Sequence, residues 1–339
     1  MALHKRMIPT FCSIFFMVVL ILDSKTALIG AIDGIDLCLK VVIPSLFPFL
    51  ILSAVLTEAT FGMKLRFLQP LCRLCRILDG AAPLALAGLI GGYPVGAQCI
   101  TRAWQKGQLS ASDARRMLGF CSNAGPAFIF GMTAGLFDSK TIPWVLWLIQ
   151  IAAAIMTGYL LPGRANTFAE STQVASLSPA AVLRQAMAAM SSICEWVIVF
   201  RIVINFCDRW FLNFLPPAAQ CLIAGILELT NGCCRLIQIP QDSLRFLFCA
   251  VFLSFGGIGV YMQTISVTQE LGTGNYILGK IMQTNIAVIL SLVISPILFN
   301  AETHFHIHIL LSSVVTGLIV ISFLQYKKNN SRKITAQSV

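Results

Sequence analysis

Long apolar segments separated by short polar connections follow one another along the whole chain. Runs of about 18 apolar residues or more recur, and a helix needs this length to cross the hydrocarbon core of a bilayer. The pattern predicts an all-α polytopic membrane protein with about eight transmembrane helices, embedded in a lipid bilayer. The expected spans are residues 7–22, 41–57, 117–136, 144–161, 187–206, 244–267, 281–299 and 309–324.

Two further apolar segments, 82–98 and 216–232, are interrupted where a helix would have to continue. Gly91-Gly92-Tyr93-Pro94-Val95-Gly96 breaks the first, and Leu227-Glu228-Leu229-Thr230-Asn231-Gly232 breaks the second. In a helix interior glycine costs roughly 1 kcal/mol and proline about 3 kcal/mol. Broken backbone at membrane depth is tolerated only where protein buries it or a wet cavity adjoins it. We therefore expect two re-entrant broken hairpins, and such a pair points to a transporter binding site.

Breaks are also expected inside three of the spans. Pro44 and Pro48 should kink or partly unwind span 41–57, because each removes a helical hydrogen bond. Cys121-Ser122-Asn123-Ala124-Gly125-Pro126 should break span 117–136, and Phe255 to Gly259 should interrupt span 244–267.

Three segments between the spans have amphipathic or capping patterns. Residues 27–40 are mildly amphipathic and are expected on the outer surface. Residues 63–78 carry basic and apolar residues on opposite faces, which predicts an interfacial helix on the inner leaflet. Ser110 and Asp113 predict a helix start near Ala111.

The motifs occur in the same order in two halves of the chain. Gly88–Gln98 corresponds to Gly225–Cys234, and Phe120–Phe130 corresponds to Phe255–Ile265, both at an offset of about 135 residues. Because the second hairpin would enter from the opposite side of the membrane, this is an inverted repeat around a midplane cavity. The expected parts are 1–40 (first span and outer segment), 41–161 (first half), 162–182 (polar linker), 183–324 (second half) and 325–339 (basic cytoplasmic tail).

Composition agrees with a membrane protein. The 339 residues are 57% hydrophobic and 11% charged, whereas a soluble domain carries about 25% charged residues. The net charge is +10, but the basic residues concentrate in the connections between spans. This distribution follows the positive-inside rule, places both termini in the cytoplasm and gives no support to nucleic-acid binding.

Glu228 is the first candidate for a functional site. A carboxylate at the bilayer centre costs at least about 2.5–3.5 kcal/mol, so it should face a cavity or a partner. It could bind substrate, a proton or sodium together with Thr230 and Asn231, or it could cap the backbone of the facing half-helix. Arg201 lies six residues after Glu195 in one span, too far for a helical pair, and could neutralise Glu228 or a substrate carboxylate.

Uncharged polar residues beside the breaks complete the candidate set. Half-helix N-termini present free N–H groups to anions, and a nucleoside could use the same donors. Hydrogen bonding between helices is the alternative role. These residues are Tyr93, Gln98, Ser122, Asn123 and Gln263.

No motif indicates an enzyme, a nucleotide-driven pump or a bound cofactor. Cys72 and Cys75 have CxxC spacing, but neither a second pair nor a histidine cluster completes a zinc site. The cluster His304, His306 and His308 at the end of the last span could bind a metal, although an interfacial role is favoured.

Four motifs follow one another in a fixed order: Pro44–Phe49, Gly91–Ala97, Cys121–Phe128 and Leu227–Gly232. So arranged, the chain resembles the YlbJ-type sporulation integral membrane proteins, within the wider group that has nucleoside-recognition (Gate) domains. The resemblance covers about residues 41–267. It departs from the pattern at Gln98, where the resemblance leads us to expect lysine more often.

The resemblance implies a role in spore maturation, with a small organic anion moved across a forespore membrane; dipicolinate is the solute associated with this family. The two halves are then Gate-like. A nucleoside transporter is the second hypothesis, and a non-transporting assembly protein for the spore cortex or envelope is the third. The sequence is also compatible with a homo-oligomer.

Overall fold

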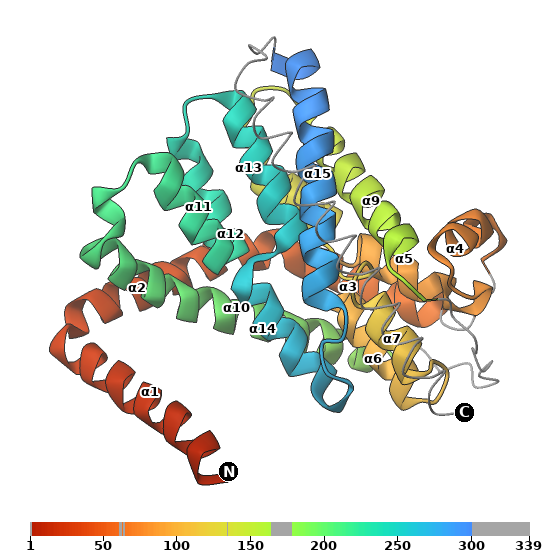
Figure 1. Cartoon of the computed structure of the whole chain (residues 1–339), viewed down its shortest axis with the longest axis horizontal. Coiled ribbons are helices and arrows are strands. Elements are labelled where there is room, and N and C mark those ends of the chain that lie inside the picture. Colours follow the sequence, from red (N-terminus) through yellow and green to blue (C-terminus); the bar gives the residue numbers. More distant parts are fainter. Residues whose placement is uncertain (1, 61–62, 64, 134, 164–177, 300–339) are drawn as a thin grey trace, which may run out of the picture.

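The computed structural model describes residues 2–60, 63, 65–133, 135–163 and 178–299. These residues form helices and no strand, which confirms the predicted all-α class (Figure 1). The helices are α1 Ala2–Leu22, α2 Ser24–Leu37, α3 Ile43–Thr60, α4 Gln69–Cys75, α5 Ala82–Ile90, α6 Val95–Gln105, α7 Ala111–Met117, α8 Pro126–Thr133, α9 Ile142–Leu160, α10 Pro179–Trp210, α11 Pro217–Leu227, α12 Leu229–Arg235, α13 Asp242–Phe255, α14 Gly257–Thr268 and α15 Tyr276–Phe299.

Within the described part of the chain, five helices are long and apolar enough to cross a membrane. The first predicted span, 7–22, lies within α1. The last, 309–324, lies outside the described residues, as does the histidine cluster. The count of about eight crossings therefore stays a prediction. The five helices are Ser24–Leu52, Ile142–Leu160, Pro179–Trp210, Asp242–Leu271 and Tyr276–Phe299.

The segment 27–40, predicted to lie on the outer surface, does not form a helix of its own, and its place relative to the membrane stays a prediction. It is α2, and a π-helical turn at Cys38–Val42 joins it to α3 in one long apolar helix. Pro44 explains the irregular turn, because it has no N–H for the carbonyl four residues earlier. The Ser45 hydroxyl donates to the carbonyl of Val41 in this turn over 2.7 Å, and α3 then continues through Pro48.

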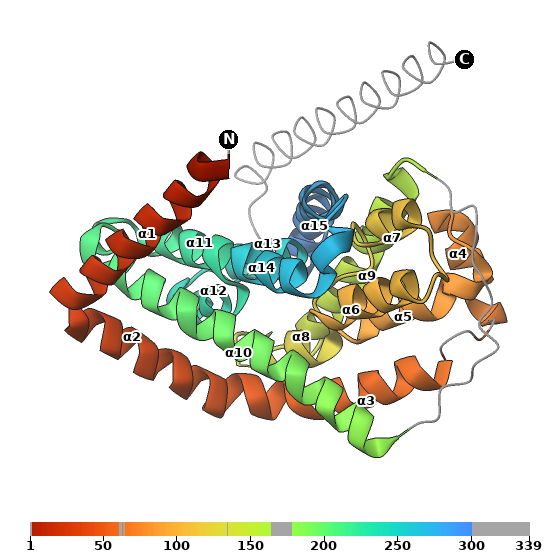
Figure 2. The same cartoon turned by 90° about the horizontal axis from the view of Figure 1, so that it is seen from below.

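The long helix α2–α3 is packed along α10, and the two form a layer on one face of the molecule (Figure 2). A Cβ atom added to Gly30 would lie 2.8 Å from the Cα of Ile202, and one added to Gly34 would lie 2.9 Å from the Cα of Ile198. Backbone therefore meets backbone here, as small residues permit between membrane helices. On the other side of the molecule α15 packs against α9 and α13.

The first broken segment is a helical hairpin. As predicted, α5 ends at Ile90 and α6 begins at Val95, with the glycine and proline residues between them. A Cβ atom added to Gly96 would lie 2.9 Å from the Cα of Gly88, and each of these glycines also touches the carbonyl of Cys121. Helices α5 and α6 thus cross where Gly88 and Gly96 meet, and the backbone at Cys121 packs against this crossing.

The second broken segment repeats this construction. Helix α11 ends at Leu227, and α12 begins at Leu229. A Cβ atom added to Gly232 would lie 2.2 Å from the Cα of Gly225, and the ring of Phe252 takes the place that the Cys121 carbonyl has in the first hairpin. The likeness of the two crossings supports an internal repeat, whereas their opposite orientation in a membrane stays a prediction.

The expected breaks inside two spans are present. Helix α7 ends at Met117 and α8 begins only at Pro126. Helices α13 and α14 meet at Gly256 and Gly257, whose φ angles of 81° and 77° lie in the left-handed region that favours glycine. Helix α7 begins at Ala111, and the Ser110 hydroxyl caps it by accepting the N–H of Asp113 over 3.1 Å.

The interfacial helix expected over 63–78 is shorter than predicted. Among the described residues of this segment, the α-helix is α4, which ends at Cys75 and is followed by Arg76 with a φ of 55°. Pro70 lies in its first turn, where proline is favoured because its missing N–H has no helical partner there. Cys72 and Cys75 are buried within it.

Candidate functional site

A cavity of about 500 Å³, counting its open mouth, lies where the two broken hairpins meet. Its wall is mostly apolar with a few polar side chains, as is usual for small-molecule sites. Each of the four sequence motifs contributes to it, so the structure brings them together as predicted. The lining residues are Leu46, Phe49, Leu50, Gly91, Gly92, Tyr93, Ala124, Gly125, Ala127, Phe128, Ile193, Glu228, Leu229, Thr230, Val260 and Gln263.

Tyr93 lies at the tip of the first hairpin and is 8% exposed. Its hydroxyl donates to the carbonyl of Leu253 over 3.4 Å, a long hydrogen bond that connects the tip to the end of α13. The same hydroxyl touches the break between α13 and α14 at Gly256. The tip of the first half is therefore packed against the break of the second half.

Glu228 lines the cavity, but its carboxylate oxygens are bonded to the start of α12. They accept the backbone N–H of Thr230 at 3.0 Å and the backbone and side-chain N–H groups of Asn231, both at 2.8 Å. The side chain is 2% exposed. This is the capping role that the sequence left open, although Glu228 caps the half-helix that follows it rather than the facing one. The side-chain amide N–H of Asn231 is thereby engaged, whereas Thr230 remains in the cavity wall.

Ser122 and Asn123 lie in the break before α8, next to the lining residue Ala124 but not in the lining themselves. The Asn123 amide donates to the carbonyls of Gly88 and Phe120, at 3.3 and 2.9 Å. Asn123 therefore holds the unwound backbone against the first hairpin. The buried hydroxyl of Ser122 has no hydrogen-bond partner in the described residues.

The two glutamines lie at different depths. Gln263 of α14 is in the cavity wall, and its Oε1 has no hydrogen-bond partner within the described structure. Gln98 of α6 is half-buried and lies outside the lining; its Oε1 is likewise unpartnered among the described groups. Of the two, only Gln263 belongs to the cavity wall.

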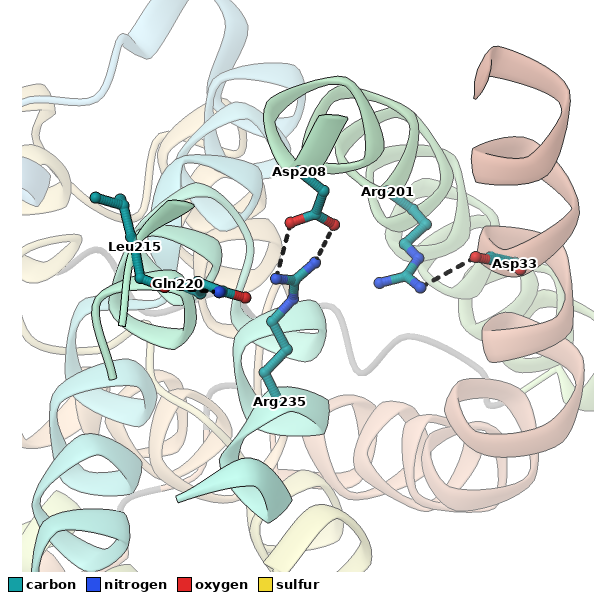
Figure 3. A network of polar contacts seen from close by, with 6 residues as sticks. All are labelled: Asp33, Arg201, Asp208, Leu215, Gln220 and Arg235. Carbon is teal, nitrogen blue, oxygen red and sulfur yellow. Dashed lines mark hydrogen bonds and ion pairs between the residues drawn. The ribbon is translucent and has the colours of Figure 1, made fainter. Parts of the chain in front are cut away.

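Arg201 does not neutralise Glu228. Its guanidinium donates to Asp33 of α2 over 3.1 Å, on the flank where α2 packs along α10 (Figure 3). Figure 3 also shows Arg235 of α12 paired with Asp208 of α10. Because α2 supplies a carboxylate at the level of Arg201, this arginine connects two helices instead of reaching the cavity.

Lys280 is the charged residue that sequence reasoning missed. It lies in the first turns of α15, is 0% exposed, and donates to Gln283 at 2.8 Å and to Asn123 at 3.3 Å. Its Nζ stands 5.1 Å from the ring centroid of Tyr93 and 5.8 Å from that of Tyr276. The predicted span begins at Ile281, which leaves Lys280 in the connection before it. Gln283, one turn further on, was the available signal for a polar helix face.

The "Sporulation integral membrane protein YlbJ" of Bacillus subtilis (strain 168) is 35% identical over 136 residues. The chain resembles YlbJ. The match covers 38% of this chain and 31% of that protein. It is shorter than the segment 41–267 that carries the motifs of the resemblance. No family model matches, and no solved structure matches.

The chain is thus a homologue of an integral membrane protein of sporulation, as YlbJ is named. Its described residues hold no cluster of three or more histidine, cysteine or acidic side chains suited to a metal ion. Cys72 and Cys75 are both free thiols. In this relative of YlbJ the polar and charged side chains that line the cavity are those of Tyr93, Glu228, Thr230 and Gln263. Lys280 stands behind the ring of Tyr93.

Proposed function

We propose that this protein is a secondary transporter or facilitator that moves a small organic anion across a forespore membrane, with dipicolinate the candidate that the family resemblance implies. The observation that carries the proposal is the cavity between the tips of two broken hairpins, one from each half of the chain. A transporter needs such a site, because rearranging one half against the other changes the side from which it is open.

The charges around the cavity favour an anion. The negative charge of Glu228 is offset by three N–H donors at 2.8–3.0 Å. The positive charge of Lys280 has neutral oxygen acceptors as its hydrogen-bond partners in the described structure. In a low-dielectric interior an incompletely offset cation acts strongly on a nearby anion. Lys280, one aromatic ring away from the cavity, is therefore the group that would attract an anionic solute.

Transport by the purified protein tests the proposal. Labelled dipicolinate or labelled nucleoside is added to the buffer outside proteoliposomes. The amount that enters is compared with the amount that enters protein-free liposomes. We expect dipicolinate to enter above the blank. Nucleoside uptake without dipicolinate uptake would favour the second hypothesis, and the absence of both would favour a non-transporting assembly protein.

A pair of matched variants makes the test specific to the cavity. Ala127→Phe adds a ring to the cavity wall and should abolish uptake, because the ring would take up space that the solute needs. Ala188→Phe adds the same ring at an exposed position of α10 and should leave uptake unchanged. Equal uptake by the two variants at equal membrane abundance would exclude this cavity as the route.

A further inference from the structure

Lys280 is held in an unusual setting for a cation. Its side chain is wholly buried, and none of the ion pairs among the described residues includes it. A lysine ammonium has three N–H donors. Two are taken by the side-chain oxygens of Asn123 and Gln283. The faces of Tyr93 and Tyr276 lie within 6 Å and complete the shell by cation–π attraction.

The acceptors of Lys280 belong to a polar network inside the helix bundle. Gln283 donates to Gln150 of α9 over 3.4 Å, and Gln150 exchanges hydrogen bonds with Ser254 of α13 at 2.8 and 3.1 Å. All of these side chains are buried. The network therefore fixes the position of the ammonium but brings no negative charge to it. A buried charge in a membrane protein without an opposite charge is costly and is usually functional.

One aromatic ring separates Lys280 from the cavity. Tyr93 lines the cavity and also stands over the ammonium, and Ala124 of the lining directly follows Asn123. Tyr93 follows Gly92, which has a φ of 75°, and the Tyr93 hydroxyl is held by a single long hydrogen bond. Movement of the hairpin tip would therefore expose Lys280 to the cavity without any change in α15.

We infer that the Lys280 ammonium binds a carboxylate of the transported solute, and that Tyr93 is the gate between it and the cavity. The inference rests on the proposed function and identifies the ligand class as small organic carboxylates. A carboxylate would supply the opposite charge that Asn123 and Gln283 lack, and a charge-assisted hydrogen bond is about twice as strong as a neutral one. Asn123 and Gln283 are positioning residues, since they hold the ammonium in place.

Binding, measured apart from transport, tests the inference. Isothermal titration calorimetry of the purified full chain in detergent gives the dissociation constant for dipicolinate. Lys280→Met should weaken binding by at least about tenfold, whereas Lys280→Arg, which keeps the charge, should retain most of it. Lys140→Met, at an exposed position, is the matched control. Pyridine-2,6-dicarboxamide, which is uncharged, should bind the wild type and Lys280→Met equally weakly.

Chemical labelling tests the gate with Lys280 in place, so the result does not depend on the folding of a Lys280 variant. Reductive methylation followed by peptide mass spectrometry reports which lysines are accessible. Lys280 should be protected in the wild type, become severalfold more reactive in Tyr93→Ala, and be protected again by dipicolinate. Lys140 should react equally in all samples.

The outcomes separate the two proposals. Equal dipicolinate affinity in the wild type and Lys280→Met, or labelling of Lys280 that ignores both Tyr93→Ala and dipicolinate, would overturn the inference. Absence of binding to the wild type would overturn it as well. Charge-dependent binding without uptake into proteoliposomes would support the inference and contradict the transport function.

Discussion

Replacing Glu228 separates its structural role from a role in transport. Its two oxygens accept three N–H groups, one from Thr230 and two from Asn231. Glu228→Ala leaves all three donors unpaired in a site that is 2% exposed. A buried donor without a partner costs about 1–3 kcal/mol, so we expect a loss of at least about 3 kcal/mol in the free energy of unfolding.

Glu228→Gln is the more informative change, because an amide has one acceptor oxygen instead of two. If that oxygen takes the place of Oε2, it keeps both bonds to Asn231, while its NH₂ group faces the N–H of Thr230. One donor is then lost, at about 1–3 kcal/mol. Glu270→Gln removes an exposed carboxylate and should change the free energy of unfolding by less than about 0.5 kcal/mol.

The assay is equilibrium unfolding in mixed detergent micelles, paired with dipicolinate uptake at matched protein abundance. The order of stability should be wild type and Glu270→Gln, then Glu228→Gln, then Glu228→Ala. If Glu228→Ala is as stable as the wild type, Glu228 is not the cap of α12. If Glu228→Gln keeps its stability but loses uptake, the carboxylate acts on the solute or on a coupling ion.

Two further predictions concern the hairpins. Gly88→Ala would place a Cβ atom 2.0 Å from the carbonyl oxygen of Cys121 and should lower the free energy of unfolding by about 1–3 kcal/mol or more. Gly135→Ala is the control, because its Cβ would meet nothing within 4 Å. Equal stability of the two variants would contradict the close crossing of α5 and α6. Single cysteines placed at 91–98 and at 227–232 should react with a membrane-impermeant thiol reagent from opposite sides, and labelling of both from one side only, in every conformation, would refute the inverted repeat.

The sequence predicted the breaks well because their causes are local. Glycine and proline disfavour a helix through their own backbone, so the interruptions after Ile90 and Met117 could be located without any tertiary information. The break after Leu227 contains neither residue; there Glu228 caps the helix that follows. The partners of Glu228 were also within reach, since they lie two and three residues along the chain.

Contacts between distant segments could not be predicted in the same way. Arg201 bonds to Asp33, 168 residues away, and the amphipathic pattern of 27–40 gave no indication that this segment packs along α10. Lys280 was missed for a related reason. A charged residue beside an apolar run is normally its boundary, and only the packing of α9, α13 and the tip at Tyr93 around α15 buries it.

Glu228 and Lys280, the charged residues of the site, both belong to the second half of the chain. They differ in how far their contacts depend on the first half. Glu228 is offset by donors that follow it directly, so its environment persists if the halves move apart. Lys280 depends on Asn123 and Tyr93 of the first half. A ligand shifts a conformational equilibrium only by binding its states with different affinity. Under the proposal, a carboxylate on Lys280 would take the place of the Tyr93 ring while Asn123 and Gln283 keep the ammonium in position. Solute binding would then itself favour the state in which the tip of the first hairpin has moved.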